Sequence, residues 1–369
     1  MRTLINRFRN FTKSKWKILL AVVLVIVIVV GIFFLFKSDG TKKNSASEVL
    51  FLLSGKCCSD IGTTYIGEDD MLYFEDAESG ASAYICDKVN CRHTKTPDCN
   101  AYIEGSERVF LYNGYVYIVA RDIEGNVLTD FCIYREDMDG NNCRKILSFS
   151  GVQGLGGYRL CDGRLLMTYK NDFDYSDVNQ PKPLEKSRCG IVLVDLNTAG
   201  LVEQKVEEGK YVIKGYAGEE NTHLLLYDAE KQRDGIYVYS TAGHTIEEIC
   251  SLDGIAIISD ISNREFVWSD ESSTYLYSYD GQKKQIADFP AAQIYIYQDK
   301  VYLTAYDRQQ DSRLYYFYDL STDRLQETGN GEAVLLGVAN DRCYYATYTD
   351  GIEEDGFVST EQYCKEGIQ

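Results

Sequence analysis

Short apolar runs alternate with polar turns between Gln293 and Glu327. The runs are rich in Tyr, Val, Ile and Leu, and they are bounded by Asp, Gln and Ser. Runs of this kind are typical of antiparallel strands joined by turns. The segment therefore predicts four strands, at Ile294–Tyr297, Val301–Tyr306, Leu314–Tyr318 and near Leu325. A turn at Asp299-Lys300 is expected to join the first strand to the second.

The same pattern occurs seven times along the chain. The second strand of each copy ends at Phe74, Ile118, Met167, Leu226, Trp268, Thr304 and Ala346, at spacings of 36 to 59 residues. A third-strand signal follows each copy, at 83–86, 132–135, 191–194, 236–239, 275–278, 314–317 and 362–365. Repeats of about 40–50 residues are typical of propellers and solenoids. The prediction is an all-β fold over 48–369, a seven-bladed β-propeller of four-stranded antiparallel blades. A two-sheet sandwich is the alternative, but seven copies are too many for one.

The ends of the repeat region predict how the ring closes. The last repeat stops after its third strand, and the apolar run Glu48–Leu53 precedes the first repeat. We expect this run to pair as the missing outer strand of the last blade, because closure removes exposed strand edges.

The N-terminal segment predicts a membrane anchor. Residues 1–17 carry six positive charges and no acid, and Ile18–Phe36 is nineteen apolar residues, about 28 Å of helix. This charge asymmetry places the N-terminus in the cytoplasm. A cleaved signal peptide would be shorter and would end in small residues, whereas this run ends in Phe36 and Lys37. We expect a single-pass protein of the cell membrane that contacts the lipid bilayer through 18–36, with a linker at 37–47 and an extracytoplasmic domain at 48–369.

The acidic charge of the chain narrows the class of partner. The net charge is −18, and residues 1–37 carry +7, which leaves −25 on 38–369. This charge argues against nucleic-acid binding. Acid gathers in the predicted loops between second and third strands, which lie on one face: 75–83, 121–131, 170–188, 228–235, 269–274, 307–312 and 349–360. Either these are ordinary polar loops, or they form an acidic face for a protein, a basic peptide or another cationic ligand such as a divalent metal. The candidate residues are Asp172, Asp174, Asp177, Asp270, Glu271, Glu353, Glu354 and Asp355.

The cysteines contain one dense cluster. Of twelve cysteines, three lie with a histidine inside fourteen residues: Cys86, Cys91, His93 and Cys99. Three thiols and an imidazole are able to complete a tetrahedral structural zinc site. The spacing matches no standard zinc finger, and exported chains use cysteines in disulfides. A structural zinc ion, a disulfide-stapled loop and free thiols all remain open.

Catalytic motifs are missing from the sequence. There is no G-x-S-x-G, H-E-x-x-H or phosphate-binding loop. His223 and His244 are expected to be surface residues. Asp137–Asn141 has its glycine too early for a calcium-binding loop and predicts a hairpin turn.

The repeated strands resemble a known group of propellers. Asn113–Tyr117 and Asp299–Leu303, with their partners Ile133–Gly140 and Tyr275–Gly281, are similar to β-propeller domains of unknown function from surface proteins of Gram-positive anaerobic bacteria. These are distant relatives of TolB-like propellers and of the YWTD-type propellers of lipoprotein receptors, although the YWTD signature is absent here. The Cys86–Cys99 segment followed by Asn100–Tyr102 resembles a recurring first-blade feature of the group. The resemblance implies an anchored propeller and no established activity.

These observations favour a non-enzymatic binding or scaffolding module at the cell surface. One alternative is an extracellular glycan- or peptide-processing enzyme with carboxylates near the propeller channel. Another is a sensor subunit of a membrane complex, but 18–36 has no G-x-x-x-G motif or ionisable residue that would favour it.

Overall fold

The computed structural model describes one compact unit within Ser47–Gln369. It covers residues 49–368 except 53, 125–126, 151, 153, 162, 175–181, 209, 218–220, 241–242, 244, 253, 263 and 350–351. The predicted tail, membrane span and linker at 1–47 lie outside these residues. No helix in the described part of the chain is long and apolar enough to cross a membrane.

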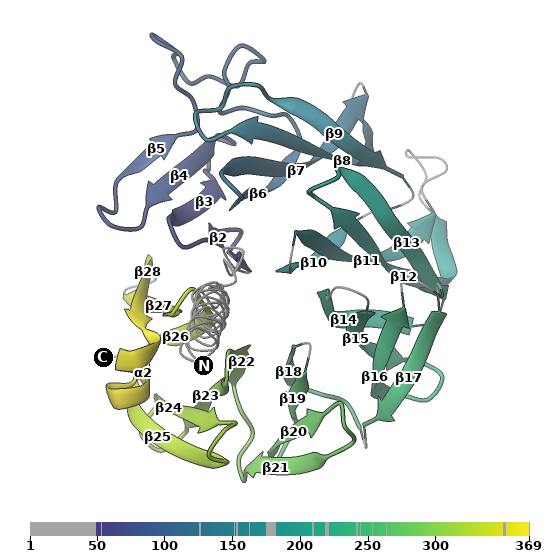
Figure 1. The fold of residues 1–369 in the computed structure, drawn as a ribbon, viewed down its shortest axis with the longest axis vertical. Coiled ribbons are helices and arrows are strands. Elements are labelled where there is room, and N and C mark those ends of the chain that lie inside the picture. The colour runs from purple at the N-terminus through teal and green to yellow at the C-terminus, as the bar shows by residue number, and fades with distance from the viewer. Residues whose placement is uncertain are drawn as a thin grey trace, which may run out of the picture. The chain divides into compact units, whose positions relative to one another are not determined.

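Seven antiparallel sheets are arranged in a ring, so the prediction of a seven-bladed propeller is confirmed (Figure 1). Five blades have four strands each, as expected, and the first and the last depart from that number. Within each of these five blades the strands follow the chain from the centre of the ring outwards. Hairpins between sequence neighbours account for all of the strand pairing in the described sheets.

The first blade contains β1 (Leu50–Phe51), β2 (Cys57–Cys58), β3 (Gly62–Ile66), β4 (Leu72–Asp76) and β5 (Ser82–Tyr84), and the second contains β6 (Ser106–Tyr112), β7 (Tyr115–Glu124), β8 (Val127–Asp137) and β9 (Arg144–Phe149). The third blade contains β10 (Leu155–Cys161), β11 (Arg164–Asp174), β12 (Lys182–Asp195) and β13 (Gly200–Glu208). The fourth contains β14 (Lys210–Ala217), β15 (Asn221–Asp228), β16 (Arg233–Ser240) and β17 (Thr245–Ser251). The fifth blade contains β18 (Ile258–Ile261), β19 (Glu265–Ser269), β20 (Thr274–Ser278) and β21 (Lys283–Ala287), and the sixth contains β22 (Gln293–Tyr297), β23 (Lys300–Asp307), β24 (Ser312–Asp319) and β25 (Arg324–Gly331). The seventh blade contains β26 (Val334–Ala339), β27 (Arg342–Thr349) and β28 (Ile352–Ser359).

The sixth blade contains the four strands that its sequence predicts. Tyr297 pairs with Lys300, so the first turn consists of Gln298 and Asp299, one residue earlier than expected. Gln298 has a φ of 54°, a left-handed conformation that two-residue hairpin turns require. Packing between neighbouring blades forms the core, as where Leu303 and Val301 meet Val267 of the fifth blade.

The prediction that Glu48–Leu53 closes the last blade is wrong. Leu50 pairs with Cys58 and Phe51 with Cys57, so β1 belongs to the sheet of the first blade. β1 also contacts β10 and β26, the innermost strands of the third and seventh blades. It therefore lies in the central channel, where Phe51 packs 5.3 Å from Phe110 and 5.4 Å from Tyr158, centroid to centroid. An apolar run gains more from this burial than from half-buried pairing at a blade edge.

The third strand of the last blade is also displaced from its predicted position. Gln362–Lys365 lies in the helix α2 (Thr360–Glu366), and β28 takes the place of the predicted loop 349–360. Ser359 caps the helix by accepting a hydrogen bond from the Gln362 N–H, and Gly367 ends it at a φ of 71°. The Tyr-rich pattern that predicted a strand belongs to a helix whose Tyr363 is fully buried.

Two other predicted loops are mostly strand. β7 and β8 extend the hairpin of the second blade to Glu124 and Val127, and β11 and β12 extend that of the third blade to Asp174 and Lys182. The acidic segments 121–131 and 170–188 are therefore largely hydrogen-bonded hairpins.

Candidate functional site

The Cys/His loop, residues 86–99, follows the outermost strand of the first blade. β5 ends at Tyr84, and the chain then forms turns until β6 begins. The loop thus stands where the five four-stranded blades have their outermost strand. Its two ends are anchored in the core between the first and second blades, where Ile85, Cys99 and Ala101 are buried.

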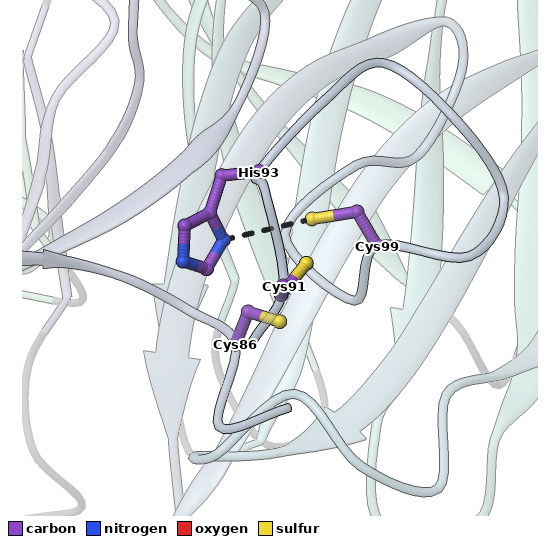
Figure 2. A group of neighbouring side chains, drawn as sticks. All are labelled: Cys86, Cys91, His93 and Cys99. Carbon is purple, nitrogen blue, oxygen red and sulfur yellow. Dashed lines mark hydrogen bonds between the residues drawn. The ribbon is translucent and has the colours of Figure 1, made fainter. Parts of the chain in front are cut away.

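The four donor side chains of this loop converge (Figure 2). One ligand atom from each of Cys86, Cys91, His93 and Cys99 lies within 4.8 Å of all the others. The Cys99 Sγ is 3.8 Å from the His93 Nδ1. A tetrahedral zinc ion bound by sulfur and nitrogen has donor–donor distances of about 3.6–3.8 Å. The structure therefore brings together all four residues that the sequence selected.

The local environment shifts the pKa values of two of the thiols in opposite directions. Burial opposes ionisation of Cys86, but backbone N–H groups of Lys88 and Asn100 donate hydrogen bonds to its sulfur, and its pKa falls below the usual thiol value. Burial raises the pKa of Cys99 to about 12, and the neighbouring Cys91 thiol adds to the effect. The backbone N–H groups therefore favour the thiolate of Cys86, whereas burial disfavours that of Cys99.

A row of neighbouring aromatic rings supports the imidazole. Tyr65, Tyr73 and Tyr84 stand on successive strands of the first blade, with centroids 5.2 and 4.5 Å apart. His93 stacks on Tyr84 at 4.2 Å and continues the row where a fourth strand would lie. This contact orients the Nδ1 of His93 toward the Cys99 sulfur.

The central channel contains a cavity of about 380 Å³ around β1. Its walls are largely apolar, and they include Phe51, Tyr158, Tyr295 and Leu336. The side chains of Arg159 and Asp260 form an ion pair that joins the third and fifth blades. Asp260 also accepts a hydrogen bond of 2.7 Å from the Ile296 N–H of the sixth blade. Sequence reasoning missed both residues, because nothing in the repeat pattern distinguishes them from other polar strand residues.

A second cavity, of about 270 Å³, lies between the seventh and first blades. We call it the junction gap; its lining includes Lys56 and Glu75 from the first blade and Tyr344, Asp355 and Phe357 from the seventh. Lys56 Nζ lies 2.5 Å from the Asp355 carboxylate and joins its two sides. The aromatic side of β28 at this gap is accessible, since Phe357 is 45 % exposed and Tyr348 on β27 is 56 % exposed.

The acidic candidates do not form one group. Asp270 and Glu271 occupy the β19–β20 turn of the fifth blade, and Glu353, Glu354 and Asp355 lie on β28 of the seventh. The sixth blade separates these two sets (Figure 1). Asp172 and Asp174 are at the end of β11 in the third blade, and Asp177 lies outside the described residues.

Several of the loop acids have a structural use. Asp270 accepts hydrogen bonds from the N–H groups of Ser272 and Ser273, at 2.8 and 2.9 Å. Burial opposes ionisation of Asp270, but these N–H groups hold its pKa below the usual carboxyl value. Asp76 and Asp307 accept N–H bonds in the same way in their own turns. Part of the acidic enrichment therefore follows from turn chemistry.

Two further ionisable groups are less exposed than expected, His223 half-buried and Glu136 fully buried. His223 was expected at the surface, but it stacks on Tyr279 at 4.1 Å, and burial lowers its pKa to about 4. Glu136 on β8 is 1 % exposed, and burial raises its pKa to about 8. His244 lies outside the described residues.

Comparison with known proteins places the fold. No family model matches the sequence, and no curated protein matches it. Among solved structures, the acylaminoacyl peptidase of Pyrococcus horikoshii aligns over 81 % of this chain and 50 % of its own, at a TM-score of 0.53 and 15 % identity. The β-propeller domain of the trilobed protease from Pyrococcus furiosus is described as having an open velcro topology. It aligns over 84 % of this chain and 95 % of its own, at a TM-score of 0.51 and 15 % identity. A prolyl endopeptidase structure aligns over 85 % of this chain and 50 % of its own, at a TM-score of 0.52 and 11 % identity.

These comparisons define the class of protein. The chain is a seven-bladed β-propeller whose fold is similar to the propeller part of several peptidases. It spans about half the length of the acylaminoacyl peptidase and prolyl endopeptidase chains. At 11 to 15 % identity the likeness concerns the fold alone, since one fold supports many functions.

Proposed function

We propose that this protein is a peptide-binding module, held at the cell surface by the predicted span 18–36. Its binding site is the outer edge of β28 in the seventh blade. One observation carries the proposal: this blade has three strands, and no described residue pairs with the outer edge of β28. A strand edge of eight residues is a template for an added strand.

The position of β28 favours an added strand over an empty edge. α2 contacts β25, β27 and β28, so it covers the side of this region that faces the sixth blade. The first blade and the junction gap stand on the other side. A peptide in the fourth-strand position would bond to β28 through its backbone and place alternate side chains into the gap.

Charge and side-chain chemistry favour a basic extended peptide. Glu353, Glu354 and Asp355 follow one another on β28, and the remainder of the chain beyond residue 37 is strongly acidic. Like charges would oppose pairing with a second copy of the same edge. The exposed Tyr348 ring offers an apolar surface for peptide side chains, and it is also able to stack on a cationic group. Phe357 is exposed as well, but the Arg342 guanidinium already lies over its ring, 4.4 Å from the centroid.

A peptide ligand also agrees with the solved structures of similar fold, several of which are peptidases. We take from them the ligand class and not the reaction. A paired-carboxylate enzyme needs two acids facing one cavity. The described residues that line the channel cavity include Arg108 and Arg159 but no Asp or Glu, so they do not supply such a pair.

The proposal is tested with the full chain in lipid nanodiscs and three labelled decapeptides. The first alternates lysine and valine, the second alternates glutamate and valine, and the third is the first with every backbone amide N-methylated. We expect the lysine peptide to bind and the glutamate peptide to fail. The methylated peptide keeps its charge but loses backbone donors, so it should fail as well.

Variants locate the binding on β28. Glu353→Gln, Glu354→Gln and Asp355→Asn together should weaken binding about tenfold, at ~0.5 kcal/mol for each charge removed. The matched control changes Glu247→Gln and Glu327→Gln, exposed acids on the outer strands of the four-stranded fourth and sixth blades. It should leave the affinity unchanged. Equal binding of the methylated peptide, or an equal effect of both variants, would reduce the interaction to general charge attraction and overturn the proposal. Failure of all three peptides to bind would overturn it too.

A further inference from the structure

We propose that Cys86, Cys91, His93 and Cys99 bind one structural zinc ion, which holds the loop that replaces the fourth strand of the first blade. This site is independent of the peptide edge on the seventh blade. The argument rests on donor geometry, on the composition of the loop and on its contacts with the second blade.

The geometry suits a four-coordinate cation. All four donors lie within 4.8 Å of one another, and Cys99 Sγ is 3.8 Å from His93 Nδ1. Contraction of the longer distances by about 1 Å would produce the tetrahedron that zinc adopts with thiolates and imidazole. Figure 2 shows the three sulfur atoms and the imidazole ring directed toward a common centre.

The donor set favours zinc over other ions. Thiolate and imidazole are the ligands of zinc, whereas calcium and magnesium take oxygen. With four protein donors the site has no open position, so its role is structural. Backbone N–H groups of Lys88, Asn100 and Ala101 donate to the Cys86 sulfur. Such bonds stabilise a thiolate that also binds a metal.

A disulfide explains the arrangement less well. One disulfide would use two of the three sulfurs and leave the third thiol and the imidazole without a purpose in the same cluster. Cys86, Cys91 and Cys99 are all thiols in the structure. His93 adopts a left-handed φ of 47°, an unusual conformation for a residue with a side chain, and this places its Nδ1 beside Cys99.

The loop needs such a link because it has little core of its own. Between Cys86 and Cys99 every residue except Cys91 and His93 is exposed, including Val89 at 89 %. An ordered segment of this length without buried apolar side chains loses conformational entropy that packing does not offset. Cys91 and His93 are the points at which the loop turns back to the blade, and a shared metal would fix both.

The site also determines how the first blade meets the second. The Asp87 N–H donates to the Asp139 carbonyl at 3.1 Å, and the side chains of Asn100 and Asn141 are hydrogen-bonded at 3.2 Å. Gly140, in the same turn of the second blade, approaches the Ile85 carbonyl so closely that a Cβ would lie 2.5 Å from it. Metal binding to Cys86 and Cys99 would therefore hold the surfaces that contact this turn.

The first test is metal content of the full chain, purified in detergent under argon with a reducing agent. We expect one zinc per chain in the wild type and less than a tenth of that in Cys91→Ser and His93→Ala. Cys143→Ser is the matched control, because Cys143 is an exposed thiol outside the cluster, and it should keep one zinc. Cobalt in place of zinc should produce the visible absorption of a tetrahedral thiolate site.

A second measurement does not depend on the folding of any variant. Stepwise addition of a mercurial reagent to the wild type in the presence of a zinc-sensing dye should release one zinc as the cluster thiols react. Zinc that persists in both variants would overturn the proposal, as would a wild type that takes up no zinc. A disulfide between any two of the three cysteines, found by alkylation and peptide mapping, would overturn it as well.

Discussion

The first and seventh blades both lack the outer strand that completes the other five, and their outer edges end differently. In the first blade the Cys/His loop follows β5, and His93 continues the row of aromatic rings that begins at Tyr65. In the seventh blade the chain turns into α2, which packs between the sixth and seventh blades and leaves the outer edge of β28 uncovered by described strands. The proposed zinc site would stabilise the loop of the first blade, and the proposed peptide site would use the open edge of the seventh.

The largest expected effect compares one substitution in both blades. Cys99→Ser should lower the free energy of unfolding by ~3–5 kcal/mol, because it removes a ligand of the proposed zinc site. Cys343 is equally buried, but it packs among Tyr302, Tyr315 and Tyr363 with no such cluster. Cys343→Ser should cost only about 1–2 kcal/mol, for burying a hydroxyl in place of a thiol. Urea unfolding in the presence of zinc and a reductant measures the free energy of unfolding of both variants. Equal decreases in the two variants would mean that the first-blade cysteines act only by packing.

The next effect tests the helix that ends the seventh blade. Tyr363 is fully buried, and its hydroxyl donates a hydrogen bond of 2.9 Å to the Leu303 carbonyl. Tyr363→Ala should cost about 3–4 kcal/mol through the cavity it leaves. Tyr363→Phe should cost ~1 kcal/mol, the value of one hydrogen bond. If thermal unfolding of the alanine variant matches that of the wild type, α2 does not support the sixth and seventh blades.

A pH effect probes the contact between the first and second blades. Glu136 lies on the side of β8 that carries Cys132 and Tyr134, which pack against the first blade. Burial raises the pKa of Glu136 from 4.5 to about 8, and the Cys86 thiol adds to this shift. Between these values the folded chain keeps a proton that the unfolded chain has released. Its contribution to stability is therefore full below pH 4.5, falls as the pH rises, and levels off above about 8.

Glu136→Gln should remove this dependence. The variant should be more stable than the wild type at pH 8 and little changed at pH 5. Urea unfolding at a series of pH values provides the measurement. Parallel stability curves for the two proteins would show that Glu136 does not titrate in this range.

The smallest effect compares two equivalent turns. Gly140 and Gly281 both have a positive φ between the third and fourth strands of their blades, at 80° and 97°. Gly281 has open space around it, whereas a Cβ on Gly140 would meet the Ile85 carbonyl. Gly281→Ala should cost ~1 kcal/mol for the backbone, and Gly140→Ala about 2 kcal/mol or more, because the first blade must also shift. Equal shifts in melting temperature would show that the turn of the second blade does not press on the first.

The candidate zinc cluster could be identified from the sequence because its donors lie within fourteen residues. The ion pair of Arg159 and Asp260 could not, since its members are 101 residues apart and meet across the ring. The acidic face was proposed from the charge of the loops. Their turn geometry explains part of that charge, and the sixth blade separates two of the groups that the proposal combined.

Local chemistry along the chain determined the number of blades and most of the strands, because period-two apolar runs and Asp- or Gly-rich turns act between neighbouring residues. Tertiary structure alone decided how the ring ends. Val49–Leu52 is apolar enough for either a blade edge or the channel, and burial among several blades favours the channel. Because that run lies in the channel, no neighbouring segment of the described chain pairs with the outer edge of β28 in the last blade. Whether an apolar segment pairs or fills a channel depends on surfaces that exist only after the other blades have assembled.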